Sequence, residues 1–399
     1  MNRILFVDDE SKVLDGIKRL FYADRKHWDM AFAQNAEDAL KLCEAAPFDL
    51  VISDMRMPGM DGAKFLGIVR DRYPDAVRIV LSGYAETEST SRVIPVAHRF
   101  LNKPCDPATL RSTIERLCAL RDLLSTPEIR RIIGVVSDLP SLSSTYRSLT
   151  QALRDPDVSM RKVAEILARD VAMSAKILQL VNSAFFGLGH KVTGLQEAAT
   201  YLGLETLKNL ALVTETFGVF KPSSSMSQAA FEAIQQHSYK TAEIIGLLPL
   251  DRKFRDDAII SGLLHDIGRV AMASKLPDMQ RAVVAHAQEY HCRWFEAEEE
   301  LLGTSHAEIG AYLLGLWGIP DATVQAVAHH HRPERISHSG LDASLAVYIA
   351  DLLTHEENAH EQPSAGFRDQ DMKYLDSLGL LPQLDEFRRL AADRLAPAR

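Results

Sequence analysis

Short apolar runs alternate with amphipathic stretches over the first part of the chain. Apolar runs of strand length fall at four places: residues 3–7, 50–53, 78–82 and 99–102. Helical patterns lie between them, as at residues 37–46 and 63–73. Buried strands that alternate with helices predict a doubly wound α/β fold with a parallel sheet. In such a sheet, functional side chains gather at the carboxyl ends of the strands.

A helical pattern begins at Pro107 and continues through the rest of the chain. The stretch 108–124 carries apolar residues at helical spacing, among them Leu110, Ile114 and Leu117, which leaves one apolar stripe to bury. We expect this stretch to be a helical relay between two domains, or the surface of a homodimer. No strand signal recurs after Leu139, and this predicts an all-α second region.

Composition and charge narrow the classes of function. A chain of 399 residues is longer than an ordinary domain built around one hydrophobic core, so two or three domains are expected. The net charge of −9 argues against direct DNA binding, because phosphate contacts need a basic face. No apolar run approaches the roughly 20 residues that span a membrane, and the N-terminus has no signal-peptide pattern. The four cysteines form no CxxC pair, so reduced thiols and a cytoplasmic location are expected.

Polar residues that suit one reaction follow the predicted strands. Asp8 and Asp9 follow the first strand, Asp54 closes the second, Ser82 ends the third and Lys103 follows the last. One pocket could hold them all, because the carboxyl ends of parallel strands meet at one edge of the sheet. A carboxylate there can accept a phosphoryl group, its neighbours can bind Mg²⁺, and a lysine and a hydroxyl can stabilise the product oxygens. Unrelated surface acids are a poor alternative to such an ordered set.

Residues 1–122 resemble the receiver domain of bacterial response regulators through the stretches FVDDE, SDMRMPGMDG, VLSGY and LNKPC. The resemblance implies that Asp54 accepts a phosphoryl group from a sensor histidine kinase. It also implies that Mg²⁺ is bound by Asp8, Asp9, Asp54 and the Arg56 backbone carbonyl. Ser82 and Lys103 would contact the phosphate, and Ser82 and Phe100 would form the switch. The resemblance also implies a cis Lys103–Pro104 bond.

The helical region resembles the HDOD domain, a relative of the HD phosphohydrolase superfamily that occurs in signalling proteins. The stretches NSAFFG, LGLETLKNL, GLLHDIG and HAEIGAYLLGLWGIP carry this resemblance in order. It implies a non-enzymatic domain that mediates interactions. The expected domains are a receiver at 1–122, a helical linker at 123–138, an HDOD domain at 139–333 and a helical C-terminal extension at 334–399.

A set of histidines and aspartates matches the positions at which catalytic HD proteins carry metal ligands. The set is His237, His265, Asp266, His306, His330, His331 and Asp351. Imidazoles and carboxylates suit Zn²⁺, Mn²⁺ or iron, and a binuclear site with a bridging water would hydrolyse a phosphodiester. Hydrogen-bonded core histidines are the alternative. His265 and Asp266 are expected together on a buried helix.

Three departures favour a domain that is not an enzyme. Catalytic HD-GYP phosphodiesterases have a lysine where this chain has Arg269, and a Gly-Tyr-Pro loop is missing after His331. Ala233 stands where the trimetal members carry a glutamate.

The acidic run 296–300 is expected to be a solvated helix face. We predict a phosphorylation-controlled response regulator whose helical domain binds an unidentified partner protein or small ligand. A phosphorylation-gated, metal-dependent cyclic-dinucleotide phosphodiesterase is the alternative.

Overall fold

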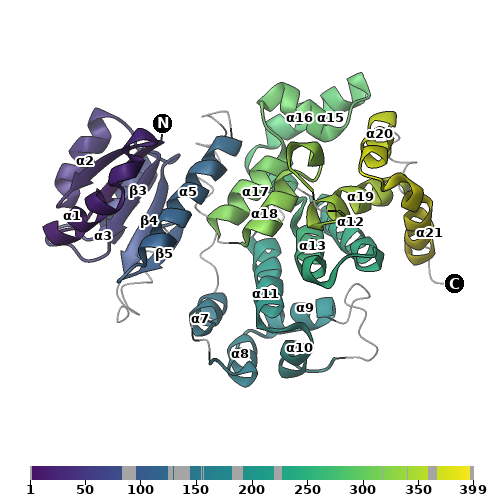
Figure 1. Cartoon of the computed structure of the whole chain (residues 1–399), viewed down its shortest axis with the longest axis horizontal. Helices are drawn as coiled ribbons and strands as arrows, with labels where there is room; N and C mark the ends of the chain where they lie inside the picture. The colour runs from purple at the N-terminus through teal and green to yellow at the C-terminus, as the bar shows by residue number, and fades with distance from the viewer. Residues whose placement is uncertain are drawn as a thin grey trace. The chain divides into compact units, whose positions relative to one another are not determined.

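The chain forms two compact units in the computed structural model: Met1–Ser141 with Leu314–Gly318, and Leu142–Leu313 with Ile319–Arg399. Figure 1 labels the elements of both. The structure describes residues 2–82, 96–124, 129, 144–153, 155, 157–181, 192–219, 227–317, 319–338, 340–357 and 366–395. The expected linker at 123–138 therefore lies largely outside the described residues.

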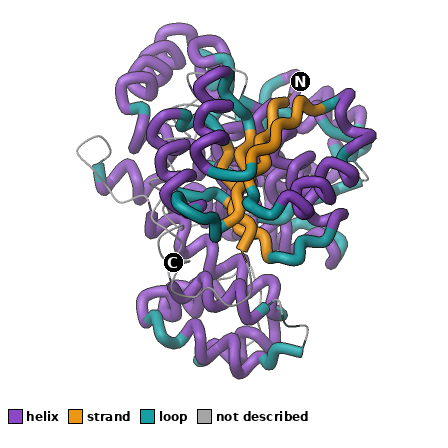
Figure 2. The backbone as a smooth tube through the Cα atoms, turned by 90° about the vertical axis from the view of Figure 1, so that its left-hand side faces the viewer, coloured by secondary structure: helices purple, strands orange, loops and turns teal. Residues whose placement is uncertain are grey.

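A five-stranded parallel sheet forms the centre of the first unit, as Figure 2 shows. Its strands are β1 (Asn2–Val7), β2 (Trp28–Ala33), β3 (Leu50–Asp54), β4 (Val77–Ser82) and β5 (Arg99–Asn102). They lie in the order β2-β1-β3-β4-β5, and every neighbouring pair is parallel. The α/β prediction is confirmed, and the carboxyl ends of the strands lie along one edge of the sheet.

Strand β2 is absent from the sequence prediction, which placed only the other four strands. It pairs with β1 along its whole length, from Trp28 opposite Asn2 to Ala33 opposite Val7. Only Trp28 and Ala33 are buried in it, because it lies at the edge of the sheet. Asp29 also interrupts its apolar run. An edge strand of this kind lacks the continuous apolar pattern of a central parallel strand.

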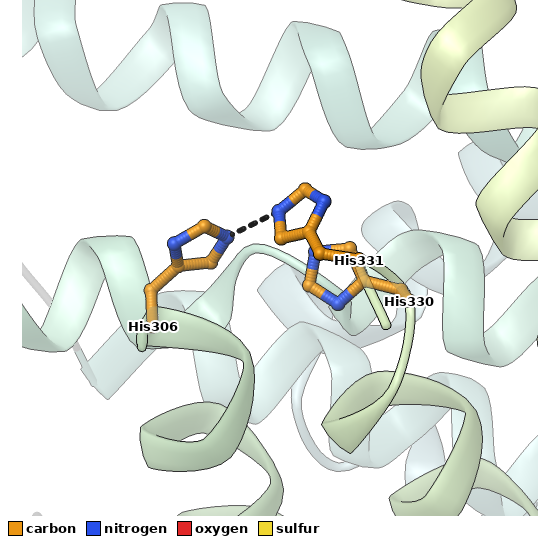
Figure 3. Close-up of side chains that lie close together, drawn as sticks. All are labelled: His306, His330 and His331. Carbon is orange, nitrogen blue, oxygen red and sulfur yellow. Dashed lines mark hydrogen bonds between the residues drawn. The ribbon is translucent and has the colours of Figure 1, made fainter. Parts of the chain in front are cut away.

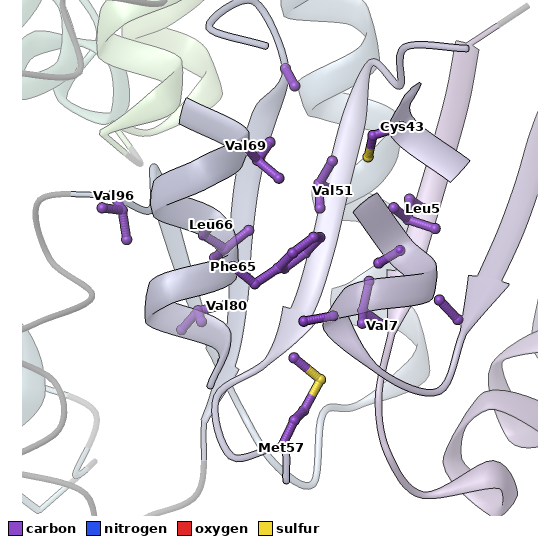
Figure 4. Packing of buried hydrophobic residues seen from close by; sticks show 14 of the residues in the cluster. Leu5, Val7, Cys43, Val51, Met57, Phe65, Leu66, Val69, Val80 and Val96 are labelled. Atoms are coloured by element: carbon purple, nitrogen blue, oxygen red, sulfur yellow. The ribbon is translucent and has the colours of Figure 1, made fainter. Parts of the chain in front are cut away.

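Helices α2 (Ala36–Ala45) and α3 (Gly62–Arg72) pack on one face of the sheet. Phe65 and Leu66 of α3 are fully buried and share this core with Val51 of β3 (Figure 4). Successive side chains of a strand point to opposite faces, so the intervening residues of β1 and β3 form a second core.

The second face carries α1 (Ser11–Leu20), the short helix η1 (Tyr22–Lys26) and α5 (Pro107–Leu123). Phe6 of β1 stacks on Phe21, which follows α1, with ring centroids 6.0 Å apart. Helices therefore cover both faces, as a doubly wound fold requires.

Helix α5 is the amphipathic helix expected at residues 108–124. Its stripe residues Leu110 and Ile114 are buried. Arg121, near its C-terminal end, donates hydrogen bonds to the backbone oxygen of Asp49 at 3.1 Å and to its carboxylate at 2.6 Å. The last turn of α5 is thereby attached to the residue that precedes β3. The role of α5 as a relay stays a prediction.

The described residues of the second unit contain helices and no strand, which confirms the all-α prediction (Figure 2). From its first helix to the short helix η3 the elements are α7 (Ser144–Ala152), α8 (Met160–Leu167), α9 (Val171–Val181), α10 (Leu195–Leu202), α11 (Leu204–Val219), α12 (Gln228–Leu247), α13 (Arg252–Leu264), α14 (Ile267–Lys275), α15 (Pro277–Tyr290), α16 (Trp294–Leu302), α17 (His306–Leu316), α18 (Asp321–Ala328) and η3 (Pro333–Arg335). The last elements are α19 (Ala343–Glu357), α20 (Asp369–Ser377), η4 (Leu381–Gln383) and α21 (Leu384–Leu395). None of the helices described in this chain has the length and apolar character of a membrane span.

Helices α12, α13, α18 and α19 pack against one another in the second unit. Helix α20 is attached to this group and to α16 through the buried Asp371. The Asp371 carboxylate forms an ion pair with Arg293, which precedes α16, and accepts a 2.7 Å hydrogen bond from the Tyr348 hydroxyl of α19. The Asp371 carboxylate of α20 therefore connects this helix to α16 and α19, and its buried charge is paired with that of Arg293.

Candidate functional site

Three of the expected receiver residues meet at the carboxyl edge of the sheet. Asp8 follows β1, Asp54 is the last residue of β3, and Lys103 follows β5. The Lys103 Nζ lies 2.6 Å from Asp8 Oδ2 and also forms an ion pair with Asp54. Asp8 and Asp54 are buried, whereas Asp9 is exposed. The arrangement places the Asp54 carboxylate beside a cation and a second carboxylate.

The turn after β3 holds Asp54 in place. The backbone N–H of Arg56 donates a 3.0 Å hydrogen bond to Asp54 Oδ2. A side chain at Gly62 would place its Cβ only 2.1 Å from the Asp54 backbone oxygen, so glycine allows α3 to begin directly against the end of β3. The chain therefore returns to the sheet within a few residues of Asp54 and leaves the Asp54 carboxylate at the edge.

The electrostatics of this pocket suit a bound cation. Burial raises the pKa of Asp54, and the Lys103 hydrogen bond opposes that rise only in part. Burial also disfavours a charged Lys103, but its hydrogen bonds to Asp54 and Asp8 outweigh burial and raise its pKa. Two carboxylates against one ammonium leave an excess of negative charge, which a hard divalent cation can offset.

The remaining receiver residues are only partly described. Ser82 ends β4 and Phe100 lies within β5, but their side chains are outside the described residues. The Lys103–Pro104 peptide bond is cis, as the resemblance implied.

The second unit brings together all seven of the predicted histidine and aspartate residues. His237 lies on α12, His306 begins α17, His330 and His331 follow α18, and Asp351 lies on α19. The prediction that His265 and Asp266 share a buried helix is wrong, because they form the junction between the end of α13 and the start of α14. The turn of the chain there directs both side chains into the cluster.

One part of the cluster consists of His306, His330 and His331, whose side chains lie close together in Figure 3. The Nε2 atoms of His306 and His331 are 3.0 Å apart. Asp266 Oδ1 lies 3.3 Å from His306 Nε2. Two imidazole nitrogens at this distance need either a shared proton or a cation between them, because two lone pairs would repel each other.

The other part of the cluster consists of His237, His265 and Asp351. Asp351 Oδ1 is 2.8 Å from His237 Nε2 and 3.6 Å from His265 Nε2. Its other oxygen lies 3.6 Å from His331 Nδ1, so Asp351 connects the two parts.

Backbone carbonyls fix the tautomers of two histidines. The Nδ1 of His265 is 2.8 Å from the Gly262 oxygen, and the Nδ1 of His330 is 2.7 Å from the Val327 oxygen. A carbonyl only accepts, so each Nδ1 carries a proton, and the neutral form of each ring presents its Nε2 lone pair. Both Nε2 atoms are buried and have no hydrogen-bond partner among the described residues. Metal-binding histidines are commonly oriented in this way, so these residues fit a divalent metal.

Glu298 is a functional candidate that sequence reasoning assigned wrongly. Its run was expected to be solvated, yet Glu298 is buried. Its Oε2 accepts hydrogen bonds from His306 Nδ1 at 2.6 Å and from the His306 backbone N–H at 2.8 Å. Glu298 therefore turns His306 so that Nε2 faces the cluster. The available signal was its spacing: Glu298 falls on the same helix face as the buried Phe295.

Charges within the cluster are strongly coupled. Burial disfavours ionised Asp266 and Asp351, but their neighbours hold both pKa values well below the usual range: Arg269 and His265 for Asp266, and His355 and His237 for Asp351. Burial also opposes protonation of His306, yet Glu298 and Asp266 outweigh it and raise its pKa to about 9. For His330, burial and the neighbouring His265 and His306 outweigh the nearby carboxylates and lower its pKa to about 3. Neutral nitrogen donors and ionised carboxylates thus occur side by side.

Arg269 is already engaged by the protein. Its guanidinium donates a 2.7 Å hydrogen bond to Asp266 and lies over the Trp294 ring, 4.2 Å from the centroid. A lysine ammonium at this position would lack both the forked N–H donors of the guanidinium and the flat face that stacks on the ring. The arginine at position 269 therefore holds its cation against Asp266 and Trp294.

Two domain families match the chain. The response regulator receiver domain matches residues 4–115, and the HDOD domain matches residues 139–333.

Among curated proteins, an uncharacterised protein of Treponema pallidum is 27% identical over 225 residues, which cover 55% of this chain and 43% of that protein. The hydrogenase transcriptional regulatory protein HoxA of Cupriavidus necator is 27% identical over 194 residues, which cover 45% of this chain and 39% of that protein. The chain thus spans less than half the length of both relatives. Among solved structures, an HDOD domain protein from Geobacter sulfurreducens is 23% identical with a TM-score of 0.46, covering 71% of this chain and 99% of that one.

Proposed function

Since the chain is a response regulator in which an HDOD domain follows a receiver domain, we propose that phosphorylation of Asp54 controls a binding function of the helical domain. A sensor histidine kinase in the cytoplasm would supply the phosphoryl group. The bound partner would be a protein or a small ligand.

One observation carries the first half of this proposal: Lys103 contacts both Asp8 and Asp54 at the edge of the sheet. Asp54 would attack the phosphorus atom, and Lys103 would contact the oxygens of the transferred group. Asp8, Asp9, Asp54 and the Arg56 carbonyl would hold Mg²⁺, which offsets the charge of the phosphoryl group. Ser82 would turn toward the new phosphate oxygens, and Phe100 would move with it.

Coupling between the two units can be tested by hydrogen exchange. Acetyl phosphate and Mg²⁺ are expected to change amide exchange both in the receiver and in helices of the HDOD domain, because a new charged group biases the switch. The control omits Mg²⁺ and adds a chelator. A change confined to residues before α5, with stoichiometric labelling, would contradict control of the helical domain.

We propose further that the histidine and aspartate cluster binds divalent transition metal without useful hydrolysis. The fixed tautomers of His265 and His330 and their unpaired Nε2 atoms support metal binding. A bound metal would supply Lewis acidity and activate water. Hydrolysis also needs a cation free to contact a substrate phosphate, and Arg269 is engaged by Asp266 and Trp294.

The completeness of the ligand set favours a second candidate, the phosphorylation-gated phosphodiesterase, and turnover assays separate the two. The protein is loaded in turn with Mn²⁺, Fe²⁺ or Zn²⁺ and incubated with cyclic di-GMP, with and without acetyl phosphate. We expect stoichiometric metal and no turnover above the metal-free control. Metal-dependent turnover that disappears in both His265→Ala and Asp266→Ala would establish the phosphodiesterase instead.

A further inference from the structure

His355 belongs to the cluster although it is not one of the seven predicted residues. It lies one turn after Asp351 on α19, and its Nε2 is 3.4 Å from Asp351 Oδ1. Its ring lies 4.6 Å from the ring of His237, centroid to centroid. His355 also lines a pocket together with Asp266, Arg269, Trp294 and Asp351. His355 therefore contacts the cluster through Asp351 and His237 and also faces the pocket.

Three imidazole nitrogens converge on one carboxylate oxygen. The Nε2 atoms of His237, His265 and His355 lie 2.8, 3.6 and 3.4 Å from Asp351 Oδ1. A tetrahedral metal with bonds of about 2.0–2.1 Å holds its donor atoms roughly 3.3 Å apart. The three separations from Asp351 Oδ1 bracket that value. The donor atoms of His237, His265 and Asp351 already lie within 4.8 Å of one another, and His355 would join them by a rotation of its side chain.

Their chemistry points to a particular class of ion. Three imidazoles and one carboxylate suit Zn²⁺ and similar transition metals better than Mg²⁺, which prefers oxygen ligands. Four protein ligands also leave a tetrahedral ion no open position. Structural metal sites are closed in this way, whereas catalytic sites retain a position for water or substrate.

We propose that His355 is the fourth protein ligand of a metal held by His237, His265 and Asp351, and that it closes this subsite against water and anions. The proposal rests on the metal binding proposed above and adds a reason for the lack of hydrolysis. His355 occupies the pocket side of the subsite, where a substrate would otherwise approach the ion.

The test compares His355→Ala and His355→Gln with the wild-type full chain in Zn²⁺ titrations buffered for free metal, followed by element analysis. Wild type is expected to bind two ions, one in each part of the cluster. Both variants should keep one ion and bind the other at least about tenfold more weakly, since losing even an outer-shell partner has that effect. His286→Ala is the matched control, because His286 also contacts a carboxylate, at 3.1 Å from Glu300, but lies outside the cluster.

Cobalt spectra test the closure. In Co²⁺-loaded protein, azide should shift the visible bands of His355→Ala more than those of wild type or His286→Ala, because the variant opens a coordination position. The glutamine variant decides the question if the alanine variant melts early by circular dichroism.

Equal zinc binding and equal azide response in wild type and both His355 variants would overturn the role of His355 while leaving metal binding intact. A wild-type protein that binds no ion would overturn both this inference and the metal binding proposed above. Neither result would contradict the proposed phosphorylation of Asp54, which is measured in a separate experiment.

Discussion

Asp54→Asn is expected to abolish phosphorylation of the chain by acetyl phosphate in the presence of Mg²⁺. An amide is a poor nucleophile toward phosphorus and a weaker ligand for a hard cation than a carboxylate, so both the reaction and the metal site are affected. Intact-mass spectrometry measures the result directly. The fold should survive, since burial raises the pKa of Asp54 and a neutral amide is therefore well tolerated there.

Asp71→Asn is the matched control for this experiment. Asp71 is an exposed aspartate in the same unit, paired with Arg70 at 2.7 Å on α3. Its amide variant should be labelled at the wild-type level. Labelling of the Asp54 variant at that same level, on any residue, would mean that the pocket around Lys103 does not select the phosphoacceptor.

Gly268→Ala is expected to destabilise the HDOD domain strongly. A Cβ at Gly268 would lie 1.9 Å from the His306 backbone oxygen and 2.9 Å from the Gly310 backbone nitrogen. Backbone atoms cannot rotate away as a side chain can, so α14 and α17 would have to separate. Such overpacking costs about 3 kcal/mol. That cost lowers the melting temperature of a domain of this size by roughly 10 °C.

The same substitution should weaken metal binding. The close approach at Gly268 is what brings Asp266 of the α13–α14 junction within 3.3 Å of His306 on α17. Gly194→Ala is the control, because no atom lies within 4 Å of the added Cβ and its φ is −140°. Thermal unfolding by circular dichroism and zinc titration give the two measurements. A Gly268 variant that melts and binds zinc like the Gly194 variant would contradict this account of the crossing.

The receiver fold could be predicted because its signals are local. Central parallel strands are continuous apolar runs, and the polar residues that follow them stand at one edge by topology alone. Strand β2 was not predicted, because only Trp28 and Ala33 are buried in it and its apolar pattern is weak. Its pairing with β1 comes from the tertiary fold, which no pattern within the strand records.

The histidine and aspartate cluster of the second unit, in contrast, could be predicted only in part from the sequence. Its histidines and aspartates could be matched to a family, but their supporting residues depend on contacts between helices. Glu298 looked like one of several acidic residues on a surface, and only the packing of α16 against His306 makes it a partner. His355 resembles any polar residue near a helix end until α19 is placed beside α12.

The ion pair between Arg293 and Asp371 bears on how this protein can be dissected. The HDOD family match ends at residue 333, whereas Asp351, His355 and Asp371 all lie beyond it. A recombinant fragment trimmed to the matched residues would lose two members of the cluster and leave the Arg293 guanidinium without its carboxylate. Breaking a buried pair by removing one partner costs about 3–5 kcal/mol. Such a fragment would misfold or appear inert for reasons unrelated to the biology of the intact chain, so the minimal unit for expression runs through α20.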